Sequence, residues 1–240
     1  MEDQPVVAVI VPLYNREKFI GSAIKSIIWQ EVKADVRIFV VDDLSTDASY
    51  RKTVAWIRDF RRATKDVMAE QLTMHHGRPG AVRNIGVLRA RKLWKPDFIT
   101  FLDADDIMDE ERLQVSLDYL TENPEAMIVT GNEMPFIEDG VDVPWLTEEI
   151  LDCSHPYPMS AMCRASLFDQ ASGFFDPTYY VLDDMEWIER QRRVVPIGHL
   201  DGRVLTHRRF HGENLTMIHR EKMLEEFDRM NEAVASTAGR

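Results

Sequence analysis

The sequence lacks the features that mark a secreted or membrane-spanning protein. It has two cysteines in 240 residues, too few for a disulfide framework, so we expect Cys153 and Cys163 to be reduced thiols. No run of about 18 apolar residues could cross a bilayer, and the N-terminus does not resemble a signal peptide. The sequence therefore predicts no transmembrane segment and a cytoplasmic location, with peripheral attachment to a membrane left open.

Basic residues are also scarce. The 29 Lys and Arg residues are outnumbered by 41 Asp and Glu residues, the net charge is -12, and no basic tail is present. Such a charge repels polyanions, so nucleic acid is not an expected partner. Internal repeats and low-complexity segments are absent too. With 45% hydrophobic and 29% charged residues, the chain is expected to fold as one compact α/β domain.

The first half of the chain alternates buried strands with amphipathic helices. Residues 6–11 are a continuous run of β-branched and apolar residues, as in a parallel strand covered on both faces, and residues 36–41, apolar except for Arg37, predict a second buried strand. Between them, residues 19–28 carry apolar side chains at helical spacing, with Asn15 as the expected cap. This order predicts a doubly wound, mostly parallel, Rossmann-like sheet flanked by helices, which binds ligands at the carboxyl ends of its strands.

The second half is less regular. The pattern predicts strands over residues 67–74, 126–130 and 203–206, helices over 81–93, 166–171 and 184–192, and a long polar loop from Phe136 to Pro158. Long loops in compact domains are often functional, so this loop is expected to help select the ligands of the protein. In the last helix, Leu224, Phe227, Met230 and Val234 form one apolar stripe that we expect to pack on the domain rather than on lipid.

Clusters of acidic residues follow two of the predicted strands. The apolar run that begins at Phe98 ends in Asp103, Asp105 and Asp106, and the second strand ends in a further pair at 42–43. Asp103 and Asp105 point to the same side of an extended backbone and repel each other unless a cation joins them. Mg²⁺ or Mn²⁺ would prefer such oxygen ligands and bring phosphates with it. The alternative is a strand end followed by a solvated helix N-terminus.

Basic residues gather in the helix that follows residues 75–80. Arg78 and Arg83 flank its first turn, where free backbone amides and the helix dipole attract anions. A contact with a diphosphate is one interpretation. A solvated basic helix face is the other.

Four motifs then occur in an order that resembles family 2 glycosyltransferases of the GT-A fold. They are Val11-Pro-Leu-Tyr-Asn-Arg16, Val41-Asp-Asp-Leu-Ser-Thr-Asp47, Gly80-Ala-Val-Arg-Asn-Ile-Gly86 and Phe101-Leu-Asp-Ala-Asp-Asp106. The likeness extends from about Val6 to His211. It implies one GT-A domain over residues 1–240, with a nucleotide-binding half over about 5–106, an acceptor-binding half over about 107–214 and a C-terminal helix over about 215–236.

The resemblance also implies residue roles. It implies a nucleoside site formed by Pro12, Tyr14, Asn15 and Arg16. Either Asp42 or Asp43 would accept a hydrogen bond from the base, commonly uracil, and Arg83 would lie near the base or diphosphate. Asp103 resembles the carboxylate on the ribose side, Asp105 resembles the metal ligand, and His211 resembles a histidine that contacts the metal or diphosphate.

A last acidic pair, Asp183-Asp184, stands where the family usually has Glu-Asp. Asp184, its second member, matches the residue that acts as general base in the family, whereas Asp183 departs from the family pattern. Glycosyltransferases of this kind move a sugar from a nucleotide-diphosphate donor to a hydroxyl. This reaction needs a carboxylate that takes a proton from the attacking hydroxyl, while a metal and an arginine stabilise the departing diphosphate. A helix N-cap is the structural alternative for this pair, and both roles can hold together.

These observations predict a glycosyltransferase that depends on Mn²⁺ or Mg²⁺, uses a UDP-sugar and inverts the configuration of the sugar, as in polysaccharide biosynthesis. A carbohydrate or lipid-linked hydroxyl would be the acceptor. Two alternatives remain. One is a non-catalytic GT-A-like module that only binds nucleotide-sugar or carbohydrate. The other is a sugar nucleotidyltransferase, which would usually have a glycine-rich loop after the first strand, whereas residues 12–17 contain no glycine.

Overall fold

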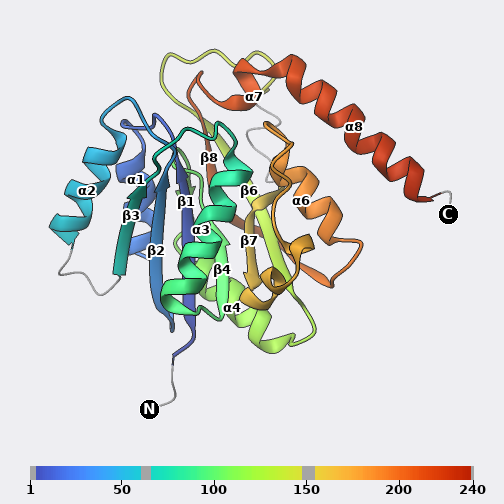
Figure 1. The fold of residues 1–240 in the computed structure, drawn as a ribbon, viewed down its shortest axis with the longest axis horizontal. Helices are drawn as coiled ribbons and strands as arrows, with labels where there is room; N and C mark the ends of the chain where they lie inside the picture. The colour runs from blue at the N-terminus through green and yellow to red at the C-terminus, as the bar shows by residue number, and fades with distance from the viewer. Residues whose placement is uncertain (1–3, 61–65, 148–154, 239–240) are drawn as a thin grey trace.

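The computed structural model describes residues 4–60, 66–147 and 155–238, which form an eight-stranded sheet with helices on both faces (Figure 1). The strands are β1 (Val6–Leu13), β2 (Asp35–Asp42), β3 (Asp66–Gln71), β4 (Phe98–Phe101), β5 (Ile107–Met108), β6 (Ile128–Ile137), β7 (His155–Arg164) and β8 (Ile197–Phe210). The α-helices are α1 (Ile20–Ile28), α2 (Ser49–Phe60), α3 (Pro79–Trp94), α4 (Arg112–Glu122), α6 (Asp183–Gln191), α7 (Leu215–Ile218) and α8 (Arg220–Ala238).

The strand order is β3-β2-β1-β4-β7-β6-β8-β5. Neighbouring strands run parallel from β3 to β4, β7 runs antiparallel to both β4 and β6, and β6 and β8 are parallel again. The prediction of a mostly parallel, helix-flanked sheet is therefore confirmed. The carboxyl ends of β1, β2 and β4 meet at one edge, which brings together the loops that carry the acidic motifs.

Two hydrophobic cores lie on opposite faces of the sheet. Because successive side chains of a strand point to opposite faces, β1 contributes Val7, Val9 and Val11 to one core and Ala8 and Ile10 to the other. The first core is closed by α1 and α4, and the second by α3 and α6. This double burial explains the continuous apolar runs over residues 6–11 of β1 and 38–41 of β2.

Helix α3 lies unusually close to the sheet. A Cβ atom at Gly86 would collide with Ile10 Cγ2 and would lie 3.1 Å from Val41 Cγ2, so only glycine allows this approach. One turn earlier, the same helix carries Arg83. The second glycine of the Gly80–Gly86 motif therefore sets how close Arg83 comes to the edge that carries the acidic loops.

Several boundaries in the second half differ from the prediction. The loop expected over Phe136 to Pro158 is shorter, because β6 continues to Ile137 and β7 begins at His155; residues 148–154 lie outside the described part. The strand expected over 203–206 is the centre of the 14-residue β8, which pairs along β6 despite its polar sequence. The helix expected over 166–171 is two 3₁₀ turns, Ala165–Asp169 and Ala171–Gly173.

The C-terminal segment also differs, because a break at His219 divides the expected helix into α7 and α8. Leu224 and Phe227 are 53% and 51% exposed, so the prediction that this stripe packs on the domain is wrong for both. The helix instead turns Glu226, 2% exposed, toward the domain. The side chain of Val234 lies outside the described residues. Figure 1 shows α8 running outward along the edge of the molecule.

The sequence predicts neither a transmembrane helix nor a disulfide. No helix among the described residues is long and apolar enough to span a membrane. Cys163 is a free and fully buried thiol whose pKa is raised by burial. Cys153 lies outside the described part of the chain.

Candidate active site

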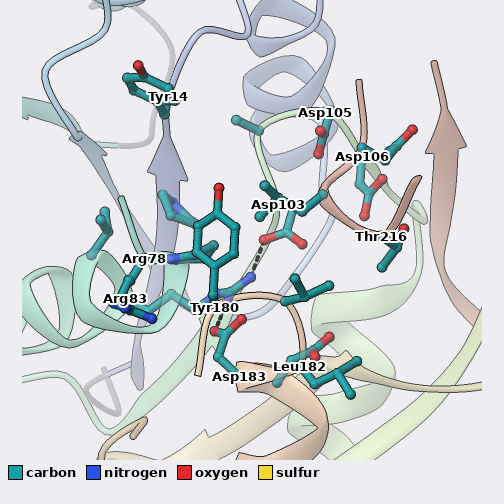
Figure 2. Close-up of a pocket in the computed structure, with 18 of the residues that line it drawn as sticks. Tyr14, Arg78, Arg83, Asp103, Asp105, Asp106, Tyr180, Leu182, Asp183 and Thr216 are labelled. Carbon is teal, nitrogen blue, oxygen red and sulfur yellow. Dashed lines mark hydrogen bonds and ion pairs between the residues drawn. The ribbon is translucent and has the colours of Figure 1, made fainter. Parts of the chain in front are cut away.

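A cavity of about 650 Å³ opens at the carboxyl ends of β1, β2 and β4 (Figure 2). Its wall is completed by the start of α6, by α7 and by the first turn of α8. Of the described lining residues, seven carry carboxylates and five are arginines. The cavity is thus more acidic than basic, so an anionic ligand is favoured there only together with a cation.

The loops after β1 and β2 form one end of the cavity. Tyr14 is 39% exposed and its ring stacks on His75, with 4.3 Å between ring centroids and 28° between planes. The Asp43 carboxylate is buried and accepts hydrogen bonds from the amides of His76 (2.7 Å) and Gly77 (2.8 Å), and His75 Nδ1 lies 2.9 Å from Asp43 Oδ2. This end presents a flat aromatic surface beside a fixed carboxylate, a combination that suits a nucleobase.

Two predicted nucleotide-binding residues do not line the cavity. Asn15 has a left-handed backbone (φ 49°), and its amide group pairs with Thr46, so it joins the loops after β1 and β2. Asp42 is fully buried and accepts hydrogen bonds from Ser45 and Gln71. Of the two acidic candidates for a base contact, Asp43 alone lies at the cavity.

Arg83 joins the two acidic segments of the site. Its Nη2 lies 2.5 Å from Asp103 Oδ1, and its Nη1 pairs with Asp183 Oδ2 (Figure 2). Arg83 is 3% exposed and its guanidinium lies 5.5 Å from the centre of the Phe175 ring. Burial lowers the pKa of this guanidinium, but Asp103 and Asp183 outweigh it and raise the pKa above its usual value. Arg83 therefore stays charged and holds β4 to α6.

The carboxylate of Asp105 faces the side chains of Arg16 and His211. Its Oδ2 lies 2.7 Å from Arg16 Nε and 3.0 Å from His211 Nε2. Burial alone would raise the pKa of Asp105, but the hydrogen bond from His211 and the charge of Arg16 lower it well below its usual range. His211 is packed against the Phe19 ring behind Asp105 and does not line the cavity itself.

Asp105 and His211, the predicted metal ligands, lie next to each other. Two ligands at about 2.1 Å and at right angles around an octahedral Mg²⁺ lie about 3 Å apart. Asp105 Oδ2 and His211 Nε2 are 3.0 Å apart but form a hydrogen bond, and Arg16 Nε lies 2.7 Å from the same oxygen, so an ion would have to replace these contacts. No group of three or more His, Cys, Asp or Glu side chains among the described residues could hold an ion.

Further residues of the site could not be found from motifs. Tyr157 of β7 places its hydroxyl 3.4 Å from both Asp103 Oδ2 and Asp106 Oδ2. Burial, together with Asp105 and Asp103, raises the pKa of Asp106 well above its usual range, which favours the neutral form beside Tyr157. Arg208 and Glu133 also line the cavity, on β8 and β6. These residues come from separate strands, so only the sheet brings them together.

Asp183 and Asp184 are the first two residues of α6. Asp183 is buried against Arg83; burial raises its pKa to about 7, although Arg83 opposes the shift. Asp184 lines the cavity, and its Oδ1 accepts a hydrogen bond from the amide of Met185 (2.7 Å). Burial also raises the pKa of Asp184, Arg83 opposes this, and Asp103 adds to it. The cavity therefore holds a carboxylate, Asp184, that Arg83 does not bind directly.

Fold and cavity together define an α/β protein of the GT-A type, with an acidic ligand site at the carboxyl edge of its parallel strands. The model of the glycosyl transferase family 2 matches residues 8–171. The chain belongs to this family.

Similar proteins support the same assignment. A Haemophilus influenzae protein described as an uncharacterized glycosyltransferase is 28% identical over 153 residues, which is 60% of this chain and 57% of that protein. The chain thus spans little more than half the length of this relative. The crystal structure of Staphylococcus aureus TarS 1-349 in complex with UDP-GlcNAc matches with a TM-score of 0.66 and 22% identity, covering 88% of this chain and 60% of that one.

A second solved structure shares the fold. The mannosyltransferase PcManGT from Pyrobaculum calidifontis, in complex with GDP-Man and Mn²⁺, matches with a TM-score of 0.63 and 19% identity. The match covers 85% of this chain and 57% of that protein. At these identities the two structures establish the GT-A fold of the chain.

Proposed function

We propose that this protein transfers a sugar from a nucleotide-diphosphate donor, a UDP-sugar, to a hydroxyl of a carbohydrate or lipid-linked acceptor, with inversion. The observation that carries the proposal is the cavity itself. It combines an aromatic and carboxylate end with an acidic centre and a carboxylate at the start of α6. Membership of glycosyl transferase family 2 and neighbours that bind UDP-GlcNAc or GDP-Man support it.

The donor would lie along the carboxyl ends of the parallel strands. Tyr14 and His75 offer a stacking surface for the base, and Asp43 a carboxylate beside it. Asp103 would contact the ribose, with Pro12 and Arg16 on the same wall of the cavity. In this proposal residues 5–106 form the nucleotide-binding half and residues 107–214 the acceptor-binding half.

Asp105 and His211 would hold Mn²⁺ or Mg²⁺. When bound, such an ion neutralises the diphosphate and stabilises the charge that develops on it. Arg16, which now pairs with Asp105, would lie beside the same diphosphate and add a second positive charge.

Asp184 would act as the general base. A carboxylate with a raised pKa accepts a proton more readily than an ordinary aspartate once it is ionised. The attacking hydroxyl would give its proton to Asp184 as the bond between sugar and phosphate breaks, so no covalent enzyme intermediate is needed for inversion. Asp183, bound by Arg83, would position the first turn of α6 instead of taking the proton.

A panel of nucleotide-sugars tests the proposal. UDP-glucose, UDP-N-acetylglucosamine and GDP-mannose are added with and without Mn²⁺, and melting temperature and nucleotide release are measured. We expect one donor to raise the melting temperature and to be turned over, both more strongly with Mn²⁺. Binding without turnover, across a range of acceptor sugars, would favour a non-catalytic module. Turnover of UTP with a sugar phosphate would favour a nucleotidyltransferase.

A further inference from the structure

One carboxylate of α8 reaches the segment that leads into Asp183 and Asp184. Glu226 Oε1 accepts a hydrogen bond from the amide of Tyr180 (2.7 Å), and its Oε2 accepts two more, from Val181 (2.9 Å) and Leu182 (3.0 Å). Glu226 is 2% exposed although it lies on a helix whose neighbouring side chains are in solvent. A buried carboxylate needs such hydrogen bonds, and here three consecutive amides provide them.

These amides precede a helix that has no cap of its own. Leu182 is the N-cap residue of α6 and makes no side-chain cap hydrogen bond. In a capping box, a Glu or Gln three residues after the N-cap accepts the hydrogen bond of the N-cap amide. Met185 occupies that position in α6 and cannot do so. Glu226 supplies the missing acceptor from a helix about 40 residues further along the chain.

We propose that Glu226 is a positioning residue for Asp184, an inference that rests on the proposed function. By holding the backbone of residues 180–182, Glu226 determines where α6 begins and in which direction its first two side chains point. The same segment carries Tyr180, whose ring lines the cavity. Glu226 itself does not line the cavity among the described residues, so it acts through the backbone and not on the substrate.

The chemistry of the contact allows a near-isosteric test. A glutamine has the volume of glutamate but one carbonyl oxygen, so Glu226→Gln turns an NH₂ group toward at least one of the three amides. Two donors then face each other, and the segment has to move. The adjacent Glu225 offers a matched control, because it is exposed and pairs with Lys222 on the helix surface (3.0 Å).

The experiment compares the wild-type protein with Glu226→Gln and Glu225→Gln. Three quantities are measured: the single-turnover rate with the nucleotide-sugar that the wild-type protein turns over, the affinity for UDP, and hydrogen exchange of the amides at 180–182. For Glu226→Gln we expect at least a tenfold slower turnover, UDP affinity within twofold, and lost protection of these amides. Glu225→Gln should match the wild type in all three.

A further variant covers the case in which Glu226→Gln does not fold. Glu226→Asp keeps both oxygens and the charge but is one methylene shorter, so we expect an intermediate loss of turnover with unchanged UDP affinity. Wild-type turnover by either variant, despite lost amide protection, would overturn the positioning role. An equal loss of UDP affinity and turnover would overturn it too. Absent turnover by the wild-type protein would contradict the proposed function itself, and the positioning role with it.

Discussion

Arg83→Met removes the cation that the buried Asp183 and the partly exposed Asp103 share. Breaking a buried ion pair costs about 3–5 kcal/mol, because the remaining partner stays buried without its counter-ion. In a chain of this size each kcal/mol lowers the melting temperature by about 2–4 °C, so we expect a fall of about 6–20 °C. Arg89→Met is a suitable control in the same helix, because Arg89 pairs with Glu70 on the surface. It should leave the melting temperature nearly unchanged.

The same variant has a pH signature. The folded pKa of Asp183 is raised to about 7, so its folded form binds more protons than the unfolded chain, and stability falls as pH rises from about 4 to 7. Above pH 7 this loss stops in the wild-type protein. Without Arg83 the pKa of Asp183 rises further. The free energy of unfolding then continues to fall above pH 7, by about 1.4 kcal/mol per pH unit. Unfolding by urea at pH 6 and pH 8 measures the free energy of unfolding of both proteins at each pH.

We expect Arg83→Met to lower the free energy of unfolding by about 1.4 kcal/mol more at pH 8 than at pH 6. Arg89→Met should show no such difference. An equal destabilisation at both pH values would refute the claim that Arg83 limits the rise in the pKa of Asp183. A fall of melting temperature no larger than that of the control would refute the buried ion pair as a stabilising link between α3 and α6.

Three further predictions concern the ligand. Asp105→Asn should abolish the strengthening of UDP binding by Mn²⁺ in calorimetry, and full metal dependence in this variant would move the metal elsewhere. His75→Ala removes the ring that stacks on Tyr14. UDP affinity should fall by about tenfold, because the variant loses about 1.4 kcal/mol of stacking. Unchanged affinity would place the base away from this surface. Because burial raises the pKa of Asp184, turnover should rise with pH along a limb above about pH 4, the ordinary aspartate value, and a flat profile down to pH 4 would argue against a buried base.

Local patterns were sufficient to predict the first half of the fold. The strands β1 and β2 carry apolar side chains on both faces because both faces are covered. The run of β1 continues past Pro12 to Leu13, so the proline does not end the strand. The carboxyl ends of parallel strands meet at one edge, so Asp43, Asp103 and Asp105 could be expected near one another. Their shared position at one cavity agrees with that expectation.

The remaining features depend on contacts between distant segments. Tyr157 and Arg208 lie on strands of the mixed half of the sheet, where pairing with β6 decides which side chains face the cavity. Glu226 is one of several glutamates of α8, and nothing in its spacing distinguishes it from the exposed Glu225. The stripe around Leu224 failed as a packing signal because three amides of another segment hold the neighbouring face of α8.

Asp184→Asn tests the central claim most directly, because the amide preserves the shape of the base but cannot take a proton. The measurement is single-turnover transfer together with titration of the donor in the same buffer, with Asp183→Asn as the neighbouring comparison. We predict that Asp184→Asn slows transfer by at least about a hundredfold while donor affinity stays within a few fold, and that Asp183→Asn affects the transfer step less. Transfer by Asp184→Asn at close to the wild-type rate, or a loss of donor binding in its place, would contradict the account.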